Sequence, residues 1–343
     1  MSTGTSISVP ESGERLLSVV IIGRNEGERL RRCLESVAAM DRDGFELEIV
    51  YVDSASVDGS VTLAGEHGAK VIALQPQRPT AALGRNAGWR ATRGSIVLFL
   101  DGDTILHPRF VVDSLPEFNR AEIAVVWGHR HEIHPKGSLY NRVLDLDWKH
   151  PPGLSSFCGG DALFRRVALE TTGGYDDTLI AGEEPELCRR ITALGYKILH
   201  VDRPMTGHDL AITRWQQYWK RATRTGHAFA EVSGRFQQTK DPFWTAESKG
   251  NRSRALQIST LFLAGIAGSI LMRSVWPFVL ICLLFALLAV RSAWRARWKS
   301  NDRVALLLYG VHSHVQQIPI YLGQLQYRWN RRKGKRSMLL DYK

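Results

Sequence analysis

The fold of this chain is decided by the stretch Ile96-Val97-Leu98-Phe99-Leu100-Asp101-Gly102-Asp103. Five consecutive apolar residues predict a buried strand, and the next three place two carboxylates on a turn that glycine makes flexible. Carboxylates spaced in this way suit a hard divalent cation that also holds a phosphate. Ordinary turns use the same residues, because aspartate bonds to its own backbone. The stretch therefore predicts either a metal-diphosphate site or a plain turn at the end of a strand.

The pattern on both sides of this stretch is typical of a layered α/β domain. From Leu16 to about Val201, short β-branched runs alternate with amphipathic helical stretches. Ligands of such sheets bind beyond the carboxyl ends of the strands, so the polar residues that follow each strand are the candidate site residues. Strands are expected at 17–23, 47–53, 70–74, 95–100 and 198–201, and helices at 26–40, 80–93, 165–172 and 184–194.

The composition indicates a membrane-facing protein. The chain has 343 residues and a formal net charge of +11, with the basic excess concentrated beside apolar segments near the carboxyl end. Such placement marks a cytoplasmic membrane face, so we expect no nucleic-acid partner. The four cysteines form no CxxC pair and no zinc spacing, which favours a reducing compartment. Residues 1–15 are expected to be a flexible N-terminus without signal-peptide features, so the catalytic part should face the cytoplasm.

Two apolar segments near the carboxyl end predict a membrane hairpin. Residues 255–272 and 274–290 carry no charge, and Arg273 alone separates them. At 1.5 Å per residue each spans about 26 Å, close to the hydrocarbon core of roughly 30 Å. Basic residues flank both outer ends, which should keep both ends in the cytoplasm. A pair of buried helices in a soluble protein is the alternative.

An apolar stripe that continues to Leu325 predicts one more helix, interrupted near Pro319. This helix either lies in the membrane interface or packs against the rest of the protein. We therefore expect a catalytic domain followed by a C-terminal membrane-associated helical region, with boundaries at 16–237 for the catalytic domain, 238–254 for a linker, 255–325 for the hairpin and interfacial helix, and 326–343 for a basic tail.

Five motifs occur in one order along residues 16–230. They are Ser18-Val19-Val20-Ile21-Ile22-Gly23-Arg24-Asn25-Glu26, Val52-Asp53-Ser54-Ala55-Ser56-Val57-Asp58-Gly59-Ser60, Gly84-Arg85-Asn86-Ala87-Gly88, Leu98-Phe99-Leu100-Asp101-Gly102-Asp103 and Gly182-Glu183-Glu184-Pro185-Glu186-Leu187. No GxGxxG loop follows the first strand and no P-loop is present. With these motifs the chain resembles family 2 glycosyltransferases of the GT-A fold, of the membrane-anchored bacterial type.

The resemblance implies a GT-A (Rossmann-like) α/β fold, a mixed, mostly parallel sheet flanked by helices. It also implies an inverting enzyme that moves a sugar from a nucleotide-diphosphate sugar, with a UDP-sugar expected first. The hairpin suggests a hydroxyl of a lipid-linked or polysaccharide acceptor at the cytoplasmic face of the cell membrane. In the donor site, the resemblance places Asp53 on the nucleotide base, Asn25 and Arg85 in the nucleoside pocket with Glu26 beside them, and Asp101 on the ribose or on a metal-bound water.

The leaving diphosphate calls for a divalent cation, because a metal bridging its phosphates stabilises the developing negative charge. The resemblance assigns that metal to Asp103 and Asp101, with His208 completing the shell. A nitrogen ligand fits Mn²⁺ better than Mg²⁺, and a purely structural histidine is the alternative. Arg221 and Arg224 are expected either to pair with the diphosphate or to form a solvated basic helix face.

Inversion needs one base that takes the proton of the acceptor hydroxyl. The family uses the aspartate of a Glu-Asp pair at a helix start, and this chain has Glu183-Glu184 there, so Glu184 is the expected base. Glu183 and Asp161 are the next candidates, although acidic residues also favour a helix amino terminus. Gly160 and Asp161 belong to a glycine-containing loop that the resemblance places on the acceptor side.

Two other functions use the same features. A catalytically inactive, membrane-associated nucleotide-sugar-binding module would retain the fold without the chemistry. A nucleotidyltransferase also uses a metal-binding carboxylate pair, but it predicts a basic, glycine-rich triphosphate loop near the amino end. Residues 23–26 do not have that composition.

Overall fold

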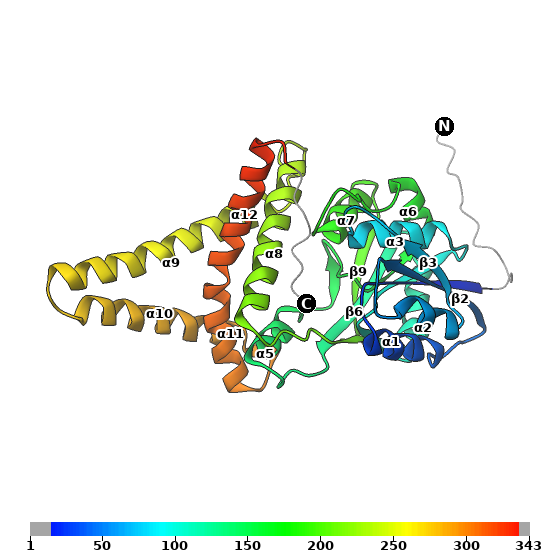
Figure 1. Cartoon of the computed structure of the whole chain (residues 1–343), viewed down its shortest axis with the longest axis horizontal. Coiled ribbons are helices and arrows are strands. Elements are labelled where there is room, and N and C mark those ends of the chain that lie inside the picture. Colours follow the sequence, from blue (N-terminus) through cyan, green and yellow to red (C-terminus); the bar gives the residue numbers. More distant parts are fainter. Residues whose placement is uncertain (1–14, 336–343) are drawn as a thin grey trace.

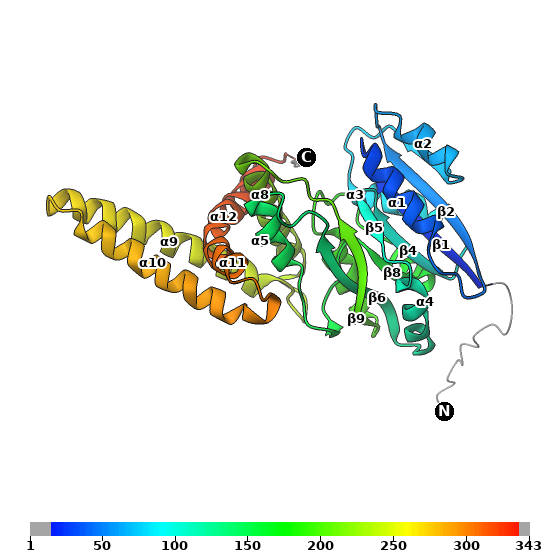
Figure 2. The same cartoon turned by 90° about the horizontal axis from the view of Figure 1, so that it is seen from below.

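The computed structural model describes residues 15–335. A layered α/β body lies at one end of the molecule, and a long helical hairpin projects from the other (Figure 1). Helices α8 (Trp215–Phe236) and α12 (Gln317–Arg332) lie side by side between the two parts in both views (Figures 1 and 2). The expected flexible N-terminus and the end of the expected basic tail fall on residues 1–14 and 336–343, outside the described residues.

The body is built on one mixed sheet with the order β3-β2-β1-β4-β8-β6-β9-β5, and β7 pairs with β9. Strands β1, β2, β3 and β4 run parallel to one another, so their carboxyl ends share one edge. The mixed, mostly parallel sheet expected from the sequence is confirmed. The strands are β1 Arg15–Gly23, β2 Phe45–Ser54, β3 Lys70–Leu74, β4 Ile96–Asp101, β5 Thr104–Leu106, β6 Ile123–Glu132, β7 Gly153–Ser155, β8 Ala162–Arg165 and β9 Lys197–His208.

Helices cover the sheet and continue beyond it. Helix α3 packs on β1 and β2, where Val19, Val20 and Val52 are fully buried. The helices of the body are α1 Glu28–Ala38, α2 Ser60–Glu66, α3 Ala81–Arg90, α4 Phe110–Ser114, α5 Leu139–Asp147, α6 Arg166–Thr172 and α7 Glu183–Ala193, with a 3₁₀ turn at Leu115–Asn119. The later helices are α8 Trp215–Phe236, α9 Thr245–Leu271, α10 Trp276–Arg295, α11 Arg303–Val315 and α12 Gln317–Arg332, with a 3₁₀ turn at Arg297–Lys299.

Strand β9 differs most from the expectation. The sequence predicted a strand at 198–201, whereas β9 continues to His208. It continues because it pairs with β6 through several register shifts and also with β5 and β7. Thr104 of β5 lies opposite His208 in this pairing. The extension places His208, a predicted metal ligand, beside β5, the strand that follows the Asp101-Gly102-Asp103 turn.

The C-terminal helices are packed tightly onto α8. A Cβ atom on Gly226 would lie 1.8 Å from the carbonyl oxygen of Ile320, and one on Gly323 would lie 1.9 Å from that of Thr223. Only glycines allow backbones to approach this closely. Helix α9 begins at Thr245, inside the stretch 238–254 that was expected to be a linker. The helical region is therefore continuous with the wall of the catalytic body.

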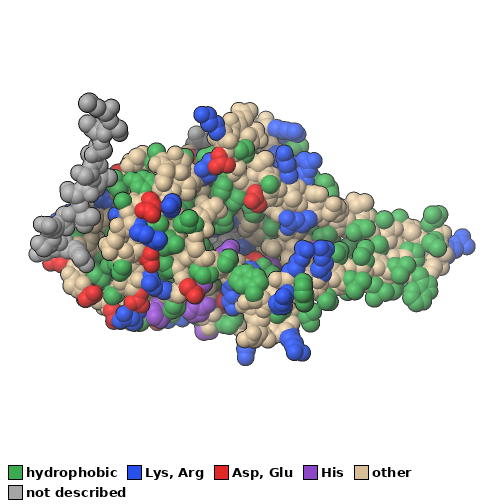
Figure 3. All heavy atoms as spheres, turned by 180° about the vertical axis from the view of Figure 1, so that it is seen from behind, with side chains coloured by type: hydrophobic (Ala, Val, Ile, Leu, Met, Phe, Trp, Pro, Cys, Tyr) green, Lys and Arg blue, Asp and Glu red, His purple; other side chains and the backbone are tan. Residues whose placement is uncertain are grey.

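The hairpin α9–α10 is apolar and exposed. Both helices are long and apolar enough to cross a membrane by length and composition, and only 11% of each apolar window is buried. Figure 3 shows green apolar side chains over the hairpin, basic side chains where it joins the body, and a basic residue at its tip. Arg273 occupies the turn between the two helices. The predicted interruption near Pro319 is confirmed, because α12 begins at Gln317 immediately after α11.

Candidate active site

A cavity of about 440 Å³ opens at the carboxyl ends of β1 and β4. Its walls come from the loop after β1, the loop that contains Gly160, the start of α7 and one face of α8. Most of the predicted site residues line it, namely Glu26, Arg85, Asp101, Asp103, Gly160, Glu183, Glu184, His208, Arg221 and Arg224. The lining residues do not include Asn25, Asp53 or Asp161.

Asp101, Asp103 and His208 form a candidate metal site. One ligand atom from each lies within 4.8 Å of the other two, and the Nε2 atom of His208 is 3.3 Å from an oxygen of Asp103. The Nδ1 atom of His208 is buried without a hydrogen-bond partner among the described residues. Burial, with the positive charge of Arg130, lowers the pKa of His208 well below its ordinary value. The imidazole is therefore neutral, the form that binds metals, and the donor set suits Mn²⁺ or Mg²⁺.

Asp161 supports this candidate metal site from within the protein core. Its side chain is fully buried. One carboxylate oxygen accepts a 3.0 Å hydrogen bond from the backbone N–H of Asp101. The other accepts from the hydroxyl of Thr206 at 2.8 Å and pairs with Arg130 at 2.9 Å. One oxygen thus holds the turn that carries Asp101 and Asp103, and the other holds the part of β9 that leads to His208. The acceptor contact expected for Asp161 stays a prediction.

Arg85 connects the metal site to the predicted base. Its side chain, from α3, is only 2% exposed. One guanidinium nitrogen is 2.8 Å from Asp101, and the other is 3.0 Å from both Glu183 and Glu184. A Cβ atom on Gly160 would lie 2.6 Å from the guanidinium, so a side chain there would displace it. The guanidinium expected in the nucleoside pocket therefore lies among three carboxylates, and its nucleoside contact stays a prediction.

Glu184, the expected base, lies at the cavity wall with a raised pKa. Its side chain is 16% exposed and lines the cavity at the first turn of α7. Burial and the neighbouring carboxylate of Glu183 raise the pKa of Glu184 to about 7, against the lowering effect of Arg85. A base whose pKa lies near the working pH transfers protons efficiently. The residue before α7, Gly182, has a φ of 84° and packs on α8, so the helix start is fixed against the opposite wall.

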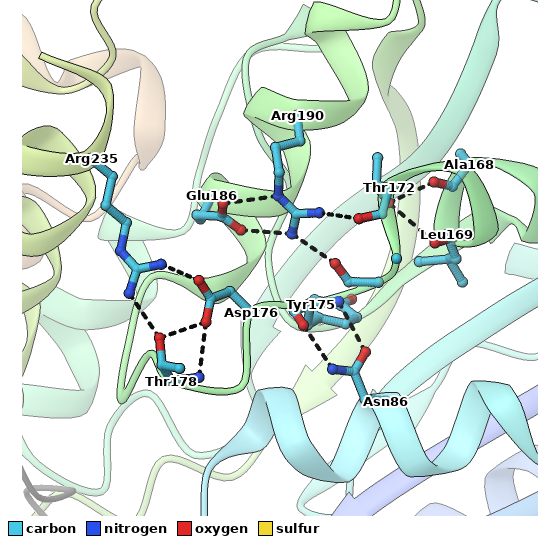
Figure 4. Close-up of polar contacts among 12 residues, drawn as sticks. Asn86, Ala168, Leu169, Thr172, Tyr175, Asp176, Thr178, Glu186, Arg190 and Arg235 are labelled. Atoms are coloured by element: carbon cyan, nitrogen blue, oxygen red, sulfur yellow. Dashed lines mark hydrogen bonds and ion pairs between the residues drawn. The ribbon is translucent and has the colours of Figure 1, made fainter. Parts of the chain in front are cut away.

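The loop between α6 and α7 ties three site-bearing helices together (Figure 4). Asn86 of α3 exchanges hydrogen bonds of 2.7 and 2.9 Å with the backbone of Tyr175. Arg190 of α7 donates 2.7 Å hydrogen bonds to the carbonyl of Thr172, the last residue of α6, and to that of Gly174 in the loop. Arg235 of α8 forms an ion pair with Asp176 of the loop. These contacts fix α3, α7 and α8 relative to one another, and with them the side chains that these helices direct into the cavity.

Two residues expected in the donor pocket join neighbouring loops. The side-chain oxygen of Asn25 accepts a 2.8 Å hydrogen bond from the N–H of Val57, and its own N–H donates to Ser56. Asp53 is 1% exposed and accepts hydrogen bonds from the hydroxyl of Tyr51 and the N–H of Ser56. Both side chains shape the loops after β1 and β2, and their contacts with the nucleotide stay predictions.

The sequence analysis missed Arg130 and Trp148, which line the cavity next to the metal site. The guanidinium carbons of Arg130 and Arg221 lie 5.4 and 5.9 Å from the centre of the Trp148 ring. That ring is 5.0 Å from the ring of His208. Neither missed residue belongs to a motif, and they come from β6 and the end of α5. Only the folded chain places them beside His208.

Three comparisons with known proteins agree with this geometry. Residues 18–173 match the model of glycosyl transferase family 2. The glycosyltransferase AglE of Haloferax volcanii is 24% identical over 191 residues, which are 53% of this chain and 63% of that relative. The chain thus aligns with less than two thirds of this relative's length.

Among solved structures, the mannosyltransferase PcManGT from Pyrobaculum calidifontis has a TM-score of 0.59 and 16% identity, covering 96% of this chain and 91% of its own. The TarS 1–349 structure from S. aureus has a TM-score of 0.51 and 14% identity, covering 93% and 92%. At these identities the likeness establishes the fold. The cavity therefore lies in a domain of the GT-A fold, whose residues 18–173 are similar to glycosyl transferase family 2.

Proposed function

We propose that this protein is an inverting, metal-dependent glycosyltransferase that moves a sugar from a nucleotide-diphosphate sugar to an acceptor hydroxyl. The observation that carries the proposal is the common cavity of Glu184 and the Asp101–Asp103–His208 site. Arg85 joins the two through ion pairs of 2.8 to 3.0 Å. A base and a metal site held this close suit a displacement in which a diphosphate leaves as a hydroxyl attacks.

The donor is proposed to be a UDP-sugar first, with other nucleotide sugars as alternatives. The PcManGT structure is a complex with GDP-Man and Mn²⁺, and a TarS 1–349 structure with a TM-score of 0.50 is a complex with UDP-GlcNAc. Bound Mn²⁺ or Mg²⁺ would supply positive charge to the departing diphosphate. Arg221 and Arg224 line the same wall and would pair with the phosphate oxygens, for which guanidinium geometry is suited.

The base follows from the same arrangement. Glu184, in its ionised form, accepts the proton of the acceptor hydroxyl while that oxygen forms a bond to the anomeric carbon. The bond from the anomeric carbon to the diphosphate oxygen breaks on the opposite side, and the nucleoside diphosphate leaves. Arg85 holds the Glu184 carboxylate in position, and Glu183 raises its pKa by charge repulsion.

We place the protein at the cytoplasmic face of the cell membrane, with a lipid-linked or polysaccharide acceptor. The support is the exposed apolar hairpin and the exposed tryptophans at its two ends. Trp276 is 67% exposed near the tip, and Trp294 is 61% exposed near the body. The helical rise between them is about 27 Å, close to the thickness of a bilayer core. Tryptophan prefers the two membrane interfaces, so this spacing suits a hairpin that spans.

The experiment is a panel of nucleotide sugars offered with Mn²⁺ to the full chain in lipid nanodiscs. We expect the productive donor to raise the melting temperature and to be turned over with release of nucleoside diphosphate. Asp103→Ala should abolish both effects, because it removes a carboxylate from the metal site. Asp41→Ala, at an exposed aspartate outside the cavity, is the matched control and should behave like the wild type.

Two results would contradict the proposal. Full turnover by Asp103→Ala would remove the metal role. Stabilisation by a donor without turnover by the wild-type chain under any acceptor condition would support the nucleotide-sugar-binding module instead.

A further inference from the structure

Trp244 holds an unusual backbone conformation at the rim of the cavity. It directly precedes α9 and has φ 56° and ψ 11°, in the left-handed region that bulky residues rarely adopt. Its side chain lines the cavity. Backbone strain of this kind persists where the surrounding structure imposes it, and it concentrates at ligand sites. The orientation of this indole is therefore a feature that needs an explanation.

Three other aromatic rings hold the indole in place. Phe243 stacks on it at 5.2 Å with an interplanar angle of 15°. Phe229 from α8 lies 4.7 Å away, and Phe157 lies 5.6 Å away at 84°. Phe157 also lines the cavity, so Phe157 and Trp244 together form what we call the aromatic rim. The rim joins the Gly160 loop, α8 and the start of α9.

The aromatic rim lies close to the predicted base. Phe157 is three residues before Gly160, so their Cα atoms are at most about 11 Å apart. A Cβ atom on Gly160 would be 3.3 Å from a carboxylate oxygen of Glu184. The Gly160 loop thus connects the rim to Glu184, and all three residues line the same cavity.

The mixture of groups around the rim indicates the chemistry of its ligand. The hydroxyl-bearing residue Thr225 of α8 lines the cavity together with the two aromatic residues. A pyranose has apolar C–H faces that stack on aromatic rings and hydroxyl edges that bond to polar groups. An isoprenoid chain has only the apolar part, and it would cover this hydroxyl without bonding to it.

We propose that Phe157 and Trp244 form an acceptor subsite that binds a sugar ring by stacking and directs one of its hydroxyls to Glu184. This assignment rests on the proposed function and makes the acceptor a carbohydrate residue. The rim is attached to the root of the hairpin. Ser248 donates from its N–H to the carbonyl of Trp244 at 2.9 Å, and Gln324 of α12 donates to the carbonyl of Ser248 at 3.1 Å. A sugar carried by a membrane-resident lipid would arrive at this rim.

The test is saturation-transfer NMR on the full chain in nanodiscs. The probes are the methyl glycosides of glucose, galactose, mannose and N-acetylglucosamine, with geranyl phosphate as the isoprenoid probe. We expect at least one glycoside to bind, with saturation strongest on its ring C–H protons. Trp244→Phe should keep this binding. Trp244→Leu and Phe157→Leu should weaken the affinity about threefold to tenfold, which corresponds to the free energy of one aromatic contact. Trp215→Leu, an exposed aromatic of α8 outside the cavity, should leave it unchanged.

The proposal is overturned if no glycoside binds saturably, if binding survives both leucine variants, or if only geranyl phosphate depends on Trp244. A melting curve accompanies each variant, and Phe157→Leu keeps the test valid if Trp244→Leu does not fold. Failure of the proposed function has a different signature, namely the absence of nucleotide-sugar turnover by the wild-type chain. Release of nucleoside diphosphate to water without acceptor should be equal in the wild type and in Trp215→Leu.

Discussion

Replacing Arg85 by methionine should destabilise the fold and disturb the base at the same time. The change keeps the length of the side chain but leaves the carboxylates of Asp101, Glu183 and Glu184 without the guanidinium that pairs with them at 2.8 to 3.0 Å. Removing one partner of a buried ion pair typically costs about 3–5 kcal/mol. Because a folded protein has only about 5–15 kcal/mol in total, this is a large fraction of its stability.

The assay is thermal unfolding of the purified full chain, followed by the pH dependence of sugar transfer. At about 2 °C per kcal/mol, the melting temperature of Arg85→Met should fall by about 6–10 °C. The remaining transfer activity should require a higher pH, because the positive charge of Arg85 lowers the pKa of Glu184.

The matched control for this prediction is Arg90→Met. Arg90 lies on the same helix but is exposed, donating to the carbonyl of Gly173 and stacking on Trp89. Its loss should cost about 0.5 kcal/mol or less. Equal melting temperatures for the two variants would refute the reasoning, because they would show that the three carboxylates do not depend on Arg85. Arg85→Lys, which keeps the charge but not the planar fork, should fall between them.

Two further predictions concern the base and the hairpin. Transfer should rise with pH through about 7 as Glu184 ionises. Glu184→Gln should lose transfer while retaining donor binding. A wild-type transfer rate in that variant would show that another residue is the base. Because of the same raised pKa, Glu184 ionises at lower pH in the unfolded chain than in the folded chain. The folded chain should therefore lose stability as pH rises from about 4.5 to about 7. In melting curves, Glu184→Gln should not show this loss. Replacing residues 262–285 by a short Gly/Ser turn would remove the outer part of the hairpin. The rings of Phe262 and Phe285 are 5.6 Å apart, so a short turn can join the remaining helix stems. This variant should be released from membranes washed with high salt, and its retention after such a wash would contradict a membrane role for the hairpin.

That excision differs from removing the whole C-terminal region. Helix α12 is packed on α8 through Gly226 and Gly323, with Ile320 4% exposed in the contact. Truncation before α9 would therefore uncover the helix that carries Arg221 and Arg224 into the cavity. Apolar periodicity alone could not show this, since a stripe that covers another helix and a stripe that faces a membrane have the same sequence pattern.

Most elements of the body could be predicted from the sequence because their signals are local. Strand β3 has the expected bounds at 70–74, and α3 begins after the N-cap Thr80. Strand β9 was predicted too short, because residues 202–208 owe their extended form to pairing with β5 and β6 and not to their own pattern. Pairing between distant strands leaves little trace in one short stretch of sequence.

The sequence by itself determined the α/β domain, the positions of the motifs and the apolar hairpin. Each depends on residue type at short spacing, which sets the backbone conformation and the buried face. Only the tertiary structure decided that Arg85 lies among three carboxylates, that Asp161 is fully buried beneath Asp101, and that Trp244 and Phe157 share one rim. Arg85 and Asp101 are 16 positions apart, and the other contacts join residues about 60 to 100 positions apart. Burial and electrostatic balance at such sites depend on how the whole chain packs.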